Sequence, residues 1–163
     1  MRKDQNQVKN DEFQERVINI RRVSKKTKGG NTISFAALVI VGDKKGRVGT
    51  GYGKGRDVSS GITKSIASAK KKLIRVQIVN GTIPHEVSAK YGAAVVLLKP
   101  APKGAGIIAG GSVRIVVELA GIKDISAKML GSSNKICNIR CALKALQKLK
   151  SVPASQTGEV KDK

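Results

Sequence analysis

The first half of the chain alternates short apolar segments with polar turns, a pattern typical of a small antiparallel sheet. Residues 17–23 and 33–41 are rich in Val and Ile, which favours strands, and residues 47–52 resume the pattern after a Gly-Asp turn. The basic segment 24–31 contains two consecutive glycines and predicts a loop between the first two strands. The sequence therefore predicts a three-stranded meander.

A helical period follows the third strand. Asp57 is a candidate N-cap for a helix that runs to about Arg75. At about 100° per residue, the apolar side chains gather on the face expected to pack on the sheet: Val58, Ile62, Ile66, Ala69 and Leu73. The opposite face carries hydroxyls and cations, namely Ser60, Lys64, Ser68, Lys71 and Arg75. A charged face is usually just solvated, but lysines without acidic partners gain no ion pairs along a helix, so we favour contact with phosphate.

The second half repeats this mixture of strands and helices. Residues 76–84 predict a short linking strand, and residues 86–89 and 93–99 predict a hairpin. Residues 112–120 fit a strand by alternation and a helix by spacing, so the residues alone leave both open. A strand at 122–130 precedes a last helix, which begins at Ser132 or Ser133 and is stopped before Pro153.

These elements predict an α+β chain with four segments. Residues 1–12 form a flexible tail, 13–76 a first domain, 77–150 a second domain, and 151–163 a second flexible tail.

Charge makes this fold a candidate binder of a polyanion. The chain has 32 Lys and Arg against 11 Asp and Glu, a net charge of +21, whereas solubility needs only about 2 to 8. Residues 1–76 carry 19 basic and 6 acidic side chains, and residues 77–163 carry 13 and 5, so both halves are expected to touch RNA. No apolar run approaches the roughly 20 residues of a spanning helix, and the N-terminus lacks a signal peptide's apolar stretch. We expect a soluble, cytoplasmic protein with a nucleic-acid partner.

Other chemistry is poorly represented in the sequence. Two Tyr, two Phe and no Trp argue against single-strand binding by base stacking and favour contacts to phosphate, sugar and helical shape. Cys137 and Cys141 lie four apart and His85 is remote, so we expect free thiols on a helix and no metal site. No Ser-His-Asp arrangement is readable, and no cofactor is expected.

Two glycine-rich runs offer the best alternatives to this interpretation. Residues 49–56 precede the first helix but lack the Gly-Lys-Ser/Thr of a P-loop, so an RNA phosphate fits that helix N-terminus better than a nucleotide. Residues 104–111 resemble the glycine loop of certain small-molecule kinases. Such an enzyme needs acidic metal ligands near the phosphates, and the acids of the second half form no motif.

Several ordered blocks resemble the bacterial small-subunit ribosomal protein S-five (S5) family. They are VSKKTKGG at 23–30, VGD at 41–43, GRVGTGYGK at 46–54, GIIAGG at 106–111 and KMLGSSN at 128–134. The resemblance covers about residues 11–150. It implies an N-terminal domain similar to double-stranded-RNA-binding domains, with a three-stranded antiparallel sheet plus a helix. It also implies a C-terminal α/β domain of the S-five domain 2-like type, which favours a helix at 112–120.

The resemblance further implies a structural constituent of the small ribosomal subunit that is not an enzyme. Such a protein binds small-subunit rRNA, contacts ribosomal proteins S-four and S-eight, supports translational accuracy and lies where mRNA enters the subunit. The loop at 24–30 is expected to reach the RNA that binds spectinomycin. No homo-oligomer is expected. The alternatives are a free-standing RNA-binding module and an enzyme on the kinase-like fold.

Candidate RNA-binding residues lie in the loop, the sheet and the helix face: Arg21, Arg22, Lys25, Lys26, Lys28, Gly29, Gly30, Arg47, Tyr52, Lys54, Arg56, Lys64, Lys71 and Arg75. The resemblance supplies the roles of the loop residues, and helical periodicity supplies the last three. The second glycine loop is a candidate protein interface near the decoding region, formed by Lys103, Gly104, Gly106, Gly110, Gly111 and Arg114.

Overall fold

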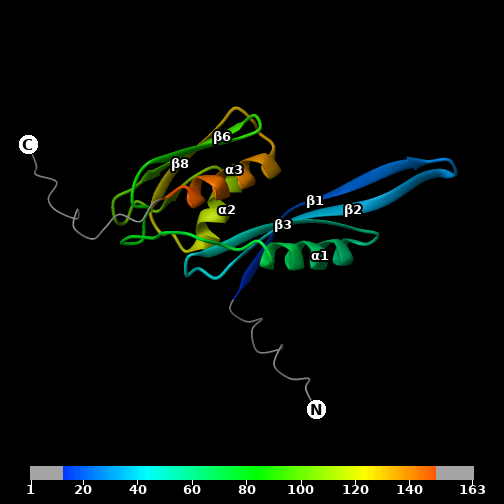
Figure 1. Cartoon of the computed structure of the whole chain (residues 1–163), viewed down its shortest axis with the longest axis horizontal. Coiled ribbons are helices and arrows are strands. Elements are labelled where there is room, and N and C mark those ends of the chain that lie inside the picture. Colours follow the sequence, from blue (N-terminus) through cyan, green and yellow to red (C-terminus); the bar gives the residue numbers. More distant parts are fainter. Residues whose placement is uncertain (1–12, 150–163) are drawn as a thin grey trace, which may run out of the picture.

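A computed structural model describes residues 13–149 and contains two four-stranded sheets and three helices (Figure 1). This confirms the predicted α+β class. Both predicted tails, 1–12 and 151–163, lie outside the described residues. The predicted domain boundary near residue 76 stays a prediction, because one buried core spans both sheets.

The first sheet has the strand order β1-β2-β3-β4 and is antiparallel throughout. Its strands are β1 (Gln14–Thr27), β2 (Gly30–Gly42), β3 (Arg47–Gly55) and β4 (Ile74–Arg75), and α1 (Val58–Lys70) packs on one face. The expected loop at 24–31 is mostly strand, because β1 and β2 pair up to Thr27 and Gly30. Basic composition suggested a loop there, but a paired ribbon does not require apolar side chains.

The first helix is shorter than predicted. It ends at Lys70, and Ile74 and Arg75 pair with Val48 and Arg47 as β4. Pairing with β3 satisfies backbone groups at the sheet edge and packs Ile74 against the core, which a longer helix could not do. Asp57 is the N-cap as predicted, although its side chain makes no cap hydrogen bond.

The glycine run of β3 is a packing surface for α1. Gly49, Gly51, Gly53 and Gly55 alternate along the strand, so they share the face that α1 covers. A Cβ at Gly51 would overlap the backbone oxygen of Ser65, and one at Gly53 would lie 2.8 Å from its backbone nitrogen. The run therefore serves close helix–sheet contact. Thr50, Tyr52 and Lys54 point to the opposite face.

The buried face of α1 also differs from the predicted one. It is centred on the small residues Gly61, Ser65 and Ala69, and Ile62 and Ile66 are only partly buried beside it. Buried Ser65 donates to the backbone oxygens of Ala37 (2.9 Å) and Gly61 (2.8 Å). Because β3 presents glycines, the closest approach falls on small side chains, and a count of large apolar residues missed this face.

The second sheet has the order β5-β6-β8-β7, with β7 parallel to β8. Its strands are β5 (Val87–Tyr91), β6 (Ala94–Pro100), β7 (Ile107–Ile108) and β8 (Ile125–Leu130). The helices α2 (Gly111–Ala120) and α3 (Lys135–Gln147) lie between this sheet and the first sheet (Figure 1). Residues 112–120, which fit both a strand and a helix by sequence pattern, therefore form a helix. The N-cap of α2 is Gly110. The N-cap of α3 is Asn134 rather than the predicted Ser132 or Ser133, and its side chain accepts from the Ile136 backbone N–H at 3.0 Å.

The turn between β2 and β3 joins the two halves of the molecule. The backbone N–H of Lys44 donates to the oxygen of Leu119 (3.0 Å), and that of Gly46 donates to Ala120 (2.9 Å). These acceptors are free carbonyls at the C-terminus of α2, so the turn caps that helix. Leu38, Ile40 and Val48 of the first sheet enter the same buried core as the second sheet and its helices.

Asp43 holds this turn in shape. Its carboxylate, 1% exposed, accepts from the Arg47 Nε at 2.6 Å and from the backbone N–H groups of Lys45 (2.8 Å) and Arg47 (2.9 Å). Burial raises the pKa of the Asp43 carboxyl, but these hydrogen bonds together outweigh it. The net result is a pKa below its ordinary value.

Asp43 should make the stability of the fold fall in acid. A carboxyl whose folded pKa is depressed contributes stability above its unfolded pKa of about 3.9, and this is lost as pH falls through the folded pKa. At pH 7 (about 3 pH units above that value), we expect Asp43→Asn to unfold about 1–2 kcal/mol more easily in urea titrations. The difference in unfolding free energy between the wild type and Asp43→Asn should become smaller below about pH 4. A difference that is constant with pH would contradict this, and Asp57→Asn, at an exposed carboxylate, is the control.

Candidate nucleic-acid interface

The β1–β2 hairpin extends beyond the body of the protein as an arm (Figure 1). β3 pairs only with residues 35–42 of β2, so residues 30–34 and their partners 23–27 form a two-stranded ribbon. Only Lys28 and Gly29 connect the strands at the tip. Thr27 Oγ1 donates to the backbone oxygen of Gly30 at 2.7 Å, and the φ of Gly30 is +128°, which favours glycine.

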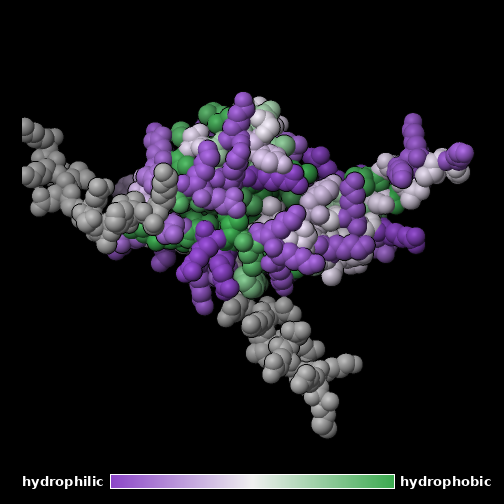
Figure 2. All heavy atoms as spheres, viewed as in Figure 1, coloured by the Kyte–Doolittle hydropathy of each residue, from purple (hydrophilic) through white to green (hydrophobic). Residues whose placement is uncertain are grey.

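The arm is cationic on both faces. Arg21 and Arg22 at its base and Lys25, Lys26 and Lys28 beyond them are all exposed, and successive strand residues point to opposite faces. The residues paired with the first four of these are Ala36, Phe35, Thr32 and Asn31, so no acid lies opposite them. Figure 2 shows hydrophilic side chains projecting along the arm. Such a ribbon can meet phosphates on either side.

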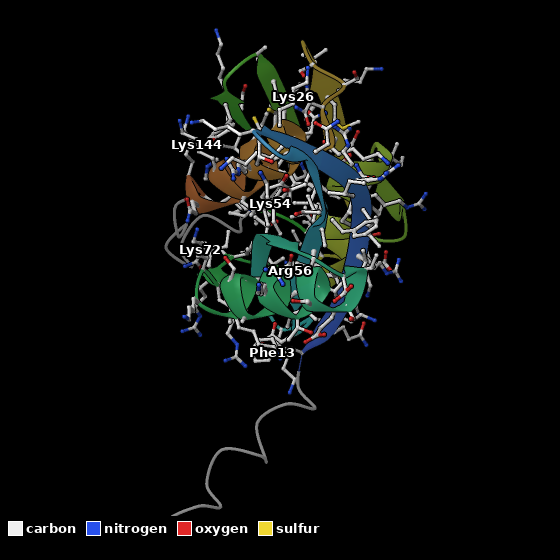
Figure 3. The ribbon with its side chains drawn as sticks, turned by 90° about the vertical axis from the view of Figure 1, so that its right-hand side faces the viewer. Phe13, Lys26, Lys54, Arg56, Lys72 and Lys144 are labelled. Carbon is white, nitrogen blue, oxygen red and sulfur yellow. The ribbon has the colours of Figure 1, made fainter. Side chains whose placement is uncertain are left out.

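The cationic surface continues from the arm onto β3. Arg21 and Lys54 both pair with Ala36, so the three residues form one row on the sheet face away from α1. Arg56 follows β3 and is exposed. Figure 3 views the molecule from the side of the arm, with Lys26, Lys54 and Arg56 one below another. Tyr52 lies two residues before Lys54 on the same face.

The structure separates Arg47 and Arg75 from this surface. They pair with each other at the opposite end of β3 from the arm. Arg47 is also bound to Asp43 and lies over the Phe13 ring, 5.0 Å from its centroid. Of the three cations of the predicted stripe, Lys64 is exposed on α1, Lys71 is exposed at the C-cap of this helix, and Arg75 lies on β4.

The second glycine loop is held in place by Asp124, which sequence reasoning missed. This buried carboxylate accepts from the backbone N–H groups of Gly104 (3.1 Å) and Gly106 (2.8 Å). Both glycines have positive φ, of +93° and +71°. In the sequence Asp124 looks like any other acid of this half. Its partners lie 20 and 18 residues away, so local pattern carries no signal for the contact.

The remaining residues of this candidate interface have different environments. A Cβ at Gly110 would overlap only the end of the flexible Met129 side chain, which can shift, so packing does not require a glycine here. A Cβ at Gly111 would meet no heavy atom within 4 Å. Lys103 and Arg114 are exposed on either side of the loop.

Within residues 13–149, no group of three His, Cys, Asp or Glu side chains could hold a metal ion. Cys141 is buried and its thiol donates to the oxygen of Ala89 at 3.0 Å; burial raises the pKa of this thiol. A protonated, buried thiol is a poor nucleophile. None of the described helices is long and apolar enough to cross a membrane.

Comparisons with known proteins match nearly the whole described chain. Residues 13–77 match the family described as "Ribosomal protein S5, N-terminal domain", and residues 89–158 match "Ribosomal protein S5, C-terminal domain". Three similar proteins carry the name "Small ribosomal subunit protein uS5". The one from Mycoplasmopsis agalactiae is 52% identical over 94% of this chain and 66% of its own length. Those from Thermotoga neapolitana and Thermotoga maritima are 52% and 54% identical, over 88% and 80% of this chain and 80% and 73% of their own lengths.

Proposed function

The chain belongs to the ribosomal protein S5 family, and on this premise we propose that it is a structural constituent of the small ribosomal subunit. It acts in the ribosome as a partner of rRNA and other ribosomal proteins, and it is not an enzyme. The observation that best supports RNA binding is the projecting arm with cations on both faces and no acid in the paired positions.

We propose that the arm and the adjoining row on β3 contact folded small-subunit rRNA through its phosphates. An RNA duplex has a major groove too deep and narrow for side chains to read, so a basic ribbon recognises shape and phosphate spacing instead. Arg21, Lys25 and Lys54 serve one face of this surface, and Arg22 and Lys26 serve the other. Arg47 has a structural role in the β2–β3 turn.

We propose that the second glycine loop faces protein S-four near the decoding region, where it supports translational accuracy. The fixed shape given by Asp124 supports a role in contact, because a preordered loop loses little conformational entropy on binding. Exposed Lys103 and Arg114 flank it. We further propose that the chain contacts protein S-eight and lies where mRNA enters the subunit. Its proposed location is the cytoplasm.

The helix face of α1 provides a direct test of RNA contact outside the arm. Exposed Lys64 and Lys71 should each neutralise one phosphate, so Lys64→Ala with Lys71→Ala should reduce the salt slope of binding to a small-subunit rRNA fragment by about 1 per lysine. The slope is measured as the change of log affinity with log salt. Lys99→Ala, at a lysine that lies 3.4 Å from Glu86, is the control and should change it less. An unchanged slope in the double variant would show that this face is merely solvated.

A further inference from the structure

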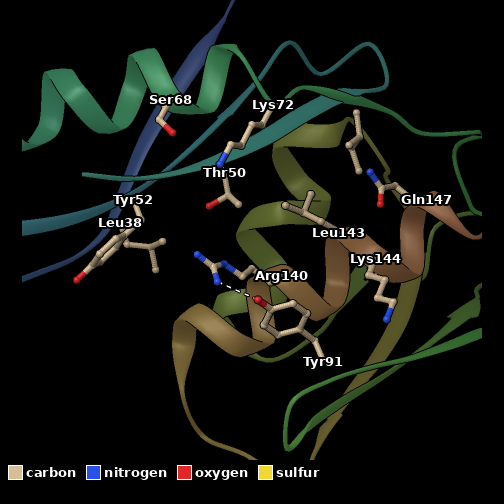
Figure 4. Close-up of a pocket in the computed structure, with 11 residues that line it drawn as sticks. Leu38, Thr50, Tyr52, Ser68, Lys72, Tyr91, Arg140, Leu143, Lys144 and Gln147 are labelled. Atoms are coloured by element: carbon tan, nitrogen blue, oxygen red, sulfur yellow. Dashed lines mark hydrogen bonds between the residues drawn. The ribbon is translucent and has the colours of Figure 1, made fainter. Parts of the chain in front are cut away.

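A cavity of about 530 Å³ lies between the two halves of the molecule (Figure 4). Its walls come from β2 and β3, the last turns of α1 and the chain just after it, the end of β5, and α3. Buried Leu38 and Leu143 line it beside polar Thr50 and Ser68. Sites for small organic groups typically measure about 300–1,000 Å³ and combine apolar walls with a few polar groups, so this cavity has the size and character of a binding site.

Both tyrosines of the chain line this one cavity. Tyr52 comes from the first sheet and Tyr91 from the second, and they remain 39% and 37% exposed. In Figure 4 Tyr52 lies at the left of the cavity and Tyr91 at its bottom, with Arg140 between them in this view. The scarcity of aromatics argued against stacking along a run of bases. Two rings in one cavity are too few to stack a run of successive bases, but they are sufficient to stack a single base.

The cavity is also cationic. Lys72, Arg140 and Lys144 line it, and none of its lining residues is acidic. The Arg140 guanidinium donates to the Tyr91 hydroxyl at 2.9 Å and lies 5.7 Å from the centre of its ring. Lys144 Nζ donates to the backbone oxygen of Lys90 at 3.3 Å. These contacts hold two of the cations in place before any ligand arrives.

We propose that this cavity binds one unpaired nucleotide of the RNA that the arm contacts. The base stacks against Tyr52 and the Arg140–Tyr91 pair, because bases stack on both aromatic rings and guanidinium planes. Its phosphate is neutralised by Lys72 and Lys144. The inference rests on the proposed RNA-binding function and adds a specific site to it.

A free nucleotide has the same chemistry, but the surface around the cavity favours RNA. Tyr52 shares one face of β3 with Lys54, and Lys54 lies in a row with Arg21 at the base of the arm. A strand whose phosphates follow this row reaches the cavity without leaving the cationic surface. A free nucleotide makes no use of that continuity.

The test compares two RNA hairpins of identical stem, one fully paired and one with a single bulged 2-aminopurine, binding to the full-length chain. We expect the bulged hairpin to bind at least about tenfold more tightly and its fluorescence to be quenched by stacking. Tyr52→Ala and Tyr91→Ala should each bring the ratio of the two affinities close to one. Tyr52→Phe, which keeps the ring, and Val79→Ala, at an exposed residue outside the cavity, should keep the wild-type ratio.

The outcomes separate this inference from the proposed function. Equal affinity for both hairpins in the wild-type chain would overturn the nucleotide site and leave RNA binding intact. Failure to bind either hairpin or a small-subunit rRNA fragment would overturn the proposed function itself. Nucleoside 5′-monophosphates form the third arm. Displacement of the bulged base by one of these nucleotides, at a concentration equal to the dissociation constant of the hairpin, would show that the cavity binds a free nucleotide. The assignment to RNA would then be wrong.

Discussion

Replacing Lys25, Lys26 and Lys28 with Glu should weaken binding to a small-subunit rRNA fragment by about 100-fold or more at moderate salt. Each substitution removes a cation from the tip of the arm and places an anion where a phosphate is expected. All three side chains are exposed, Lys25 and Lys26 on the paired strands and Lys28 in the turn between them, so the fold should survive. Fluorescence anisotropy with labelled RNA at several salt concentrations measures both the affinity and the loss of salt slope.

The matched control separates local contact from overall charge. Lys99, Lys128 and Lys135 are exposed in the second half, and reversing all three to Glu changes the net charge by the same amount. We expect this control to weaken binding far less. Equal weakening in the two triple variants would mean that the RNA senses only the total charge, and the assignment of the arm would be contradicted.

Gly51→Ala should destabilise the first sheet and its helix by about 3 kcal/mol, at the upper end of the range for overpacking. The added Cβ would overlap the backbone oxygen of Ser65 and lie 2.7 Å from the backbone nitrogen of Ala69. Backbone atoms cannot rotate aside as a flexible side chain can, so α1 must move off the sheet. In a domain of this size, the midpoint of thermal unfolding should fall by roughly 6–12 °C. Circular dichroism measures this directly.

Gly29→Ala is the control for this prediction. Gly29 lies in the turn that joins β1 and β2 at the tip of the arm, and an added Cβ would meet no heavy atom within 4 Å. Its thermal midpoint should therefore stay within about 2 °C of the wild type, as for most surface substitutions. A Gly51→Ala protein as stable as the Gly29→Ala protein would show that helix–sheet contact does not require the glycine.

The sequence predicted elements whose pattern is local. The Val-rich and Ile-rich strands, the helix after Asp57 and the hairpin of the second sheet all appear close to their expected positions. What it missed depends on distant partners. β4 exists because Ile74 meets Val48 across the sheet, and the buried face of α1 is set by the glycines of β3 rather than by its own large side chains.

The same distinction applies to the candidate site. The family resemblance and the basic run at 24–31 pointed to the cations of the arm, because a run of basic residues without acids is visible in one dimension. The fold then separated Arg47 and Arg75 from them, since these two lie at the far end of β3. Neither the role of Asp124 nor the presence of Tyr52 and Tyr91 in one cavity could be predicted. Each depends on residues brought together from different strands and loops.

The central claim is that this chain works as part of the small ribosomal subunit, and sedimentation of cell extracts tests it most directly. The full-length chain carrying a small tag would be followed across a sucrose gradient at moderate salt, alongside the Lys25, Lys26 and Lys28 to Glu variant. We predict that the wild-type chain sediments with small subunits in near-stoichiometric amount and that the variant is depleted from them. Recovery of the wild-type chain mainly in the soluble fraction would contradict the claim and favour a free-standing RNA-binding protein.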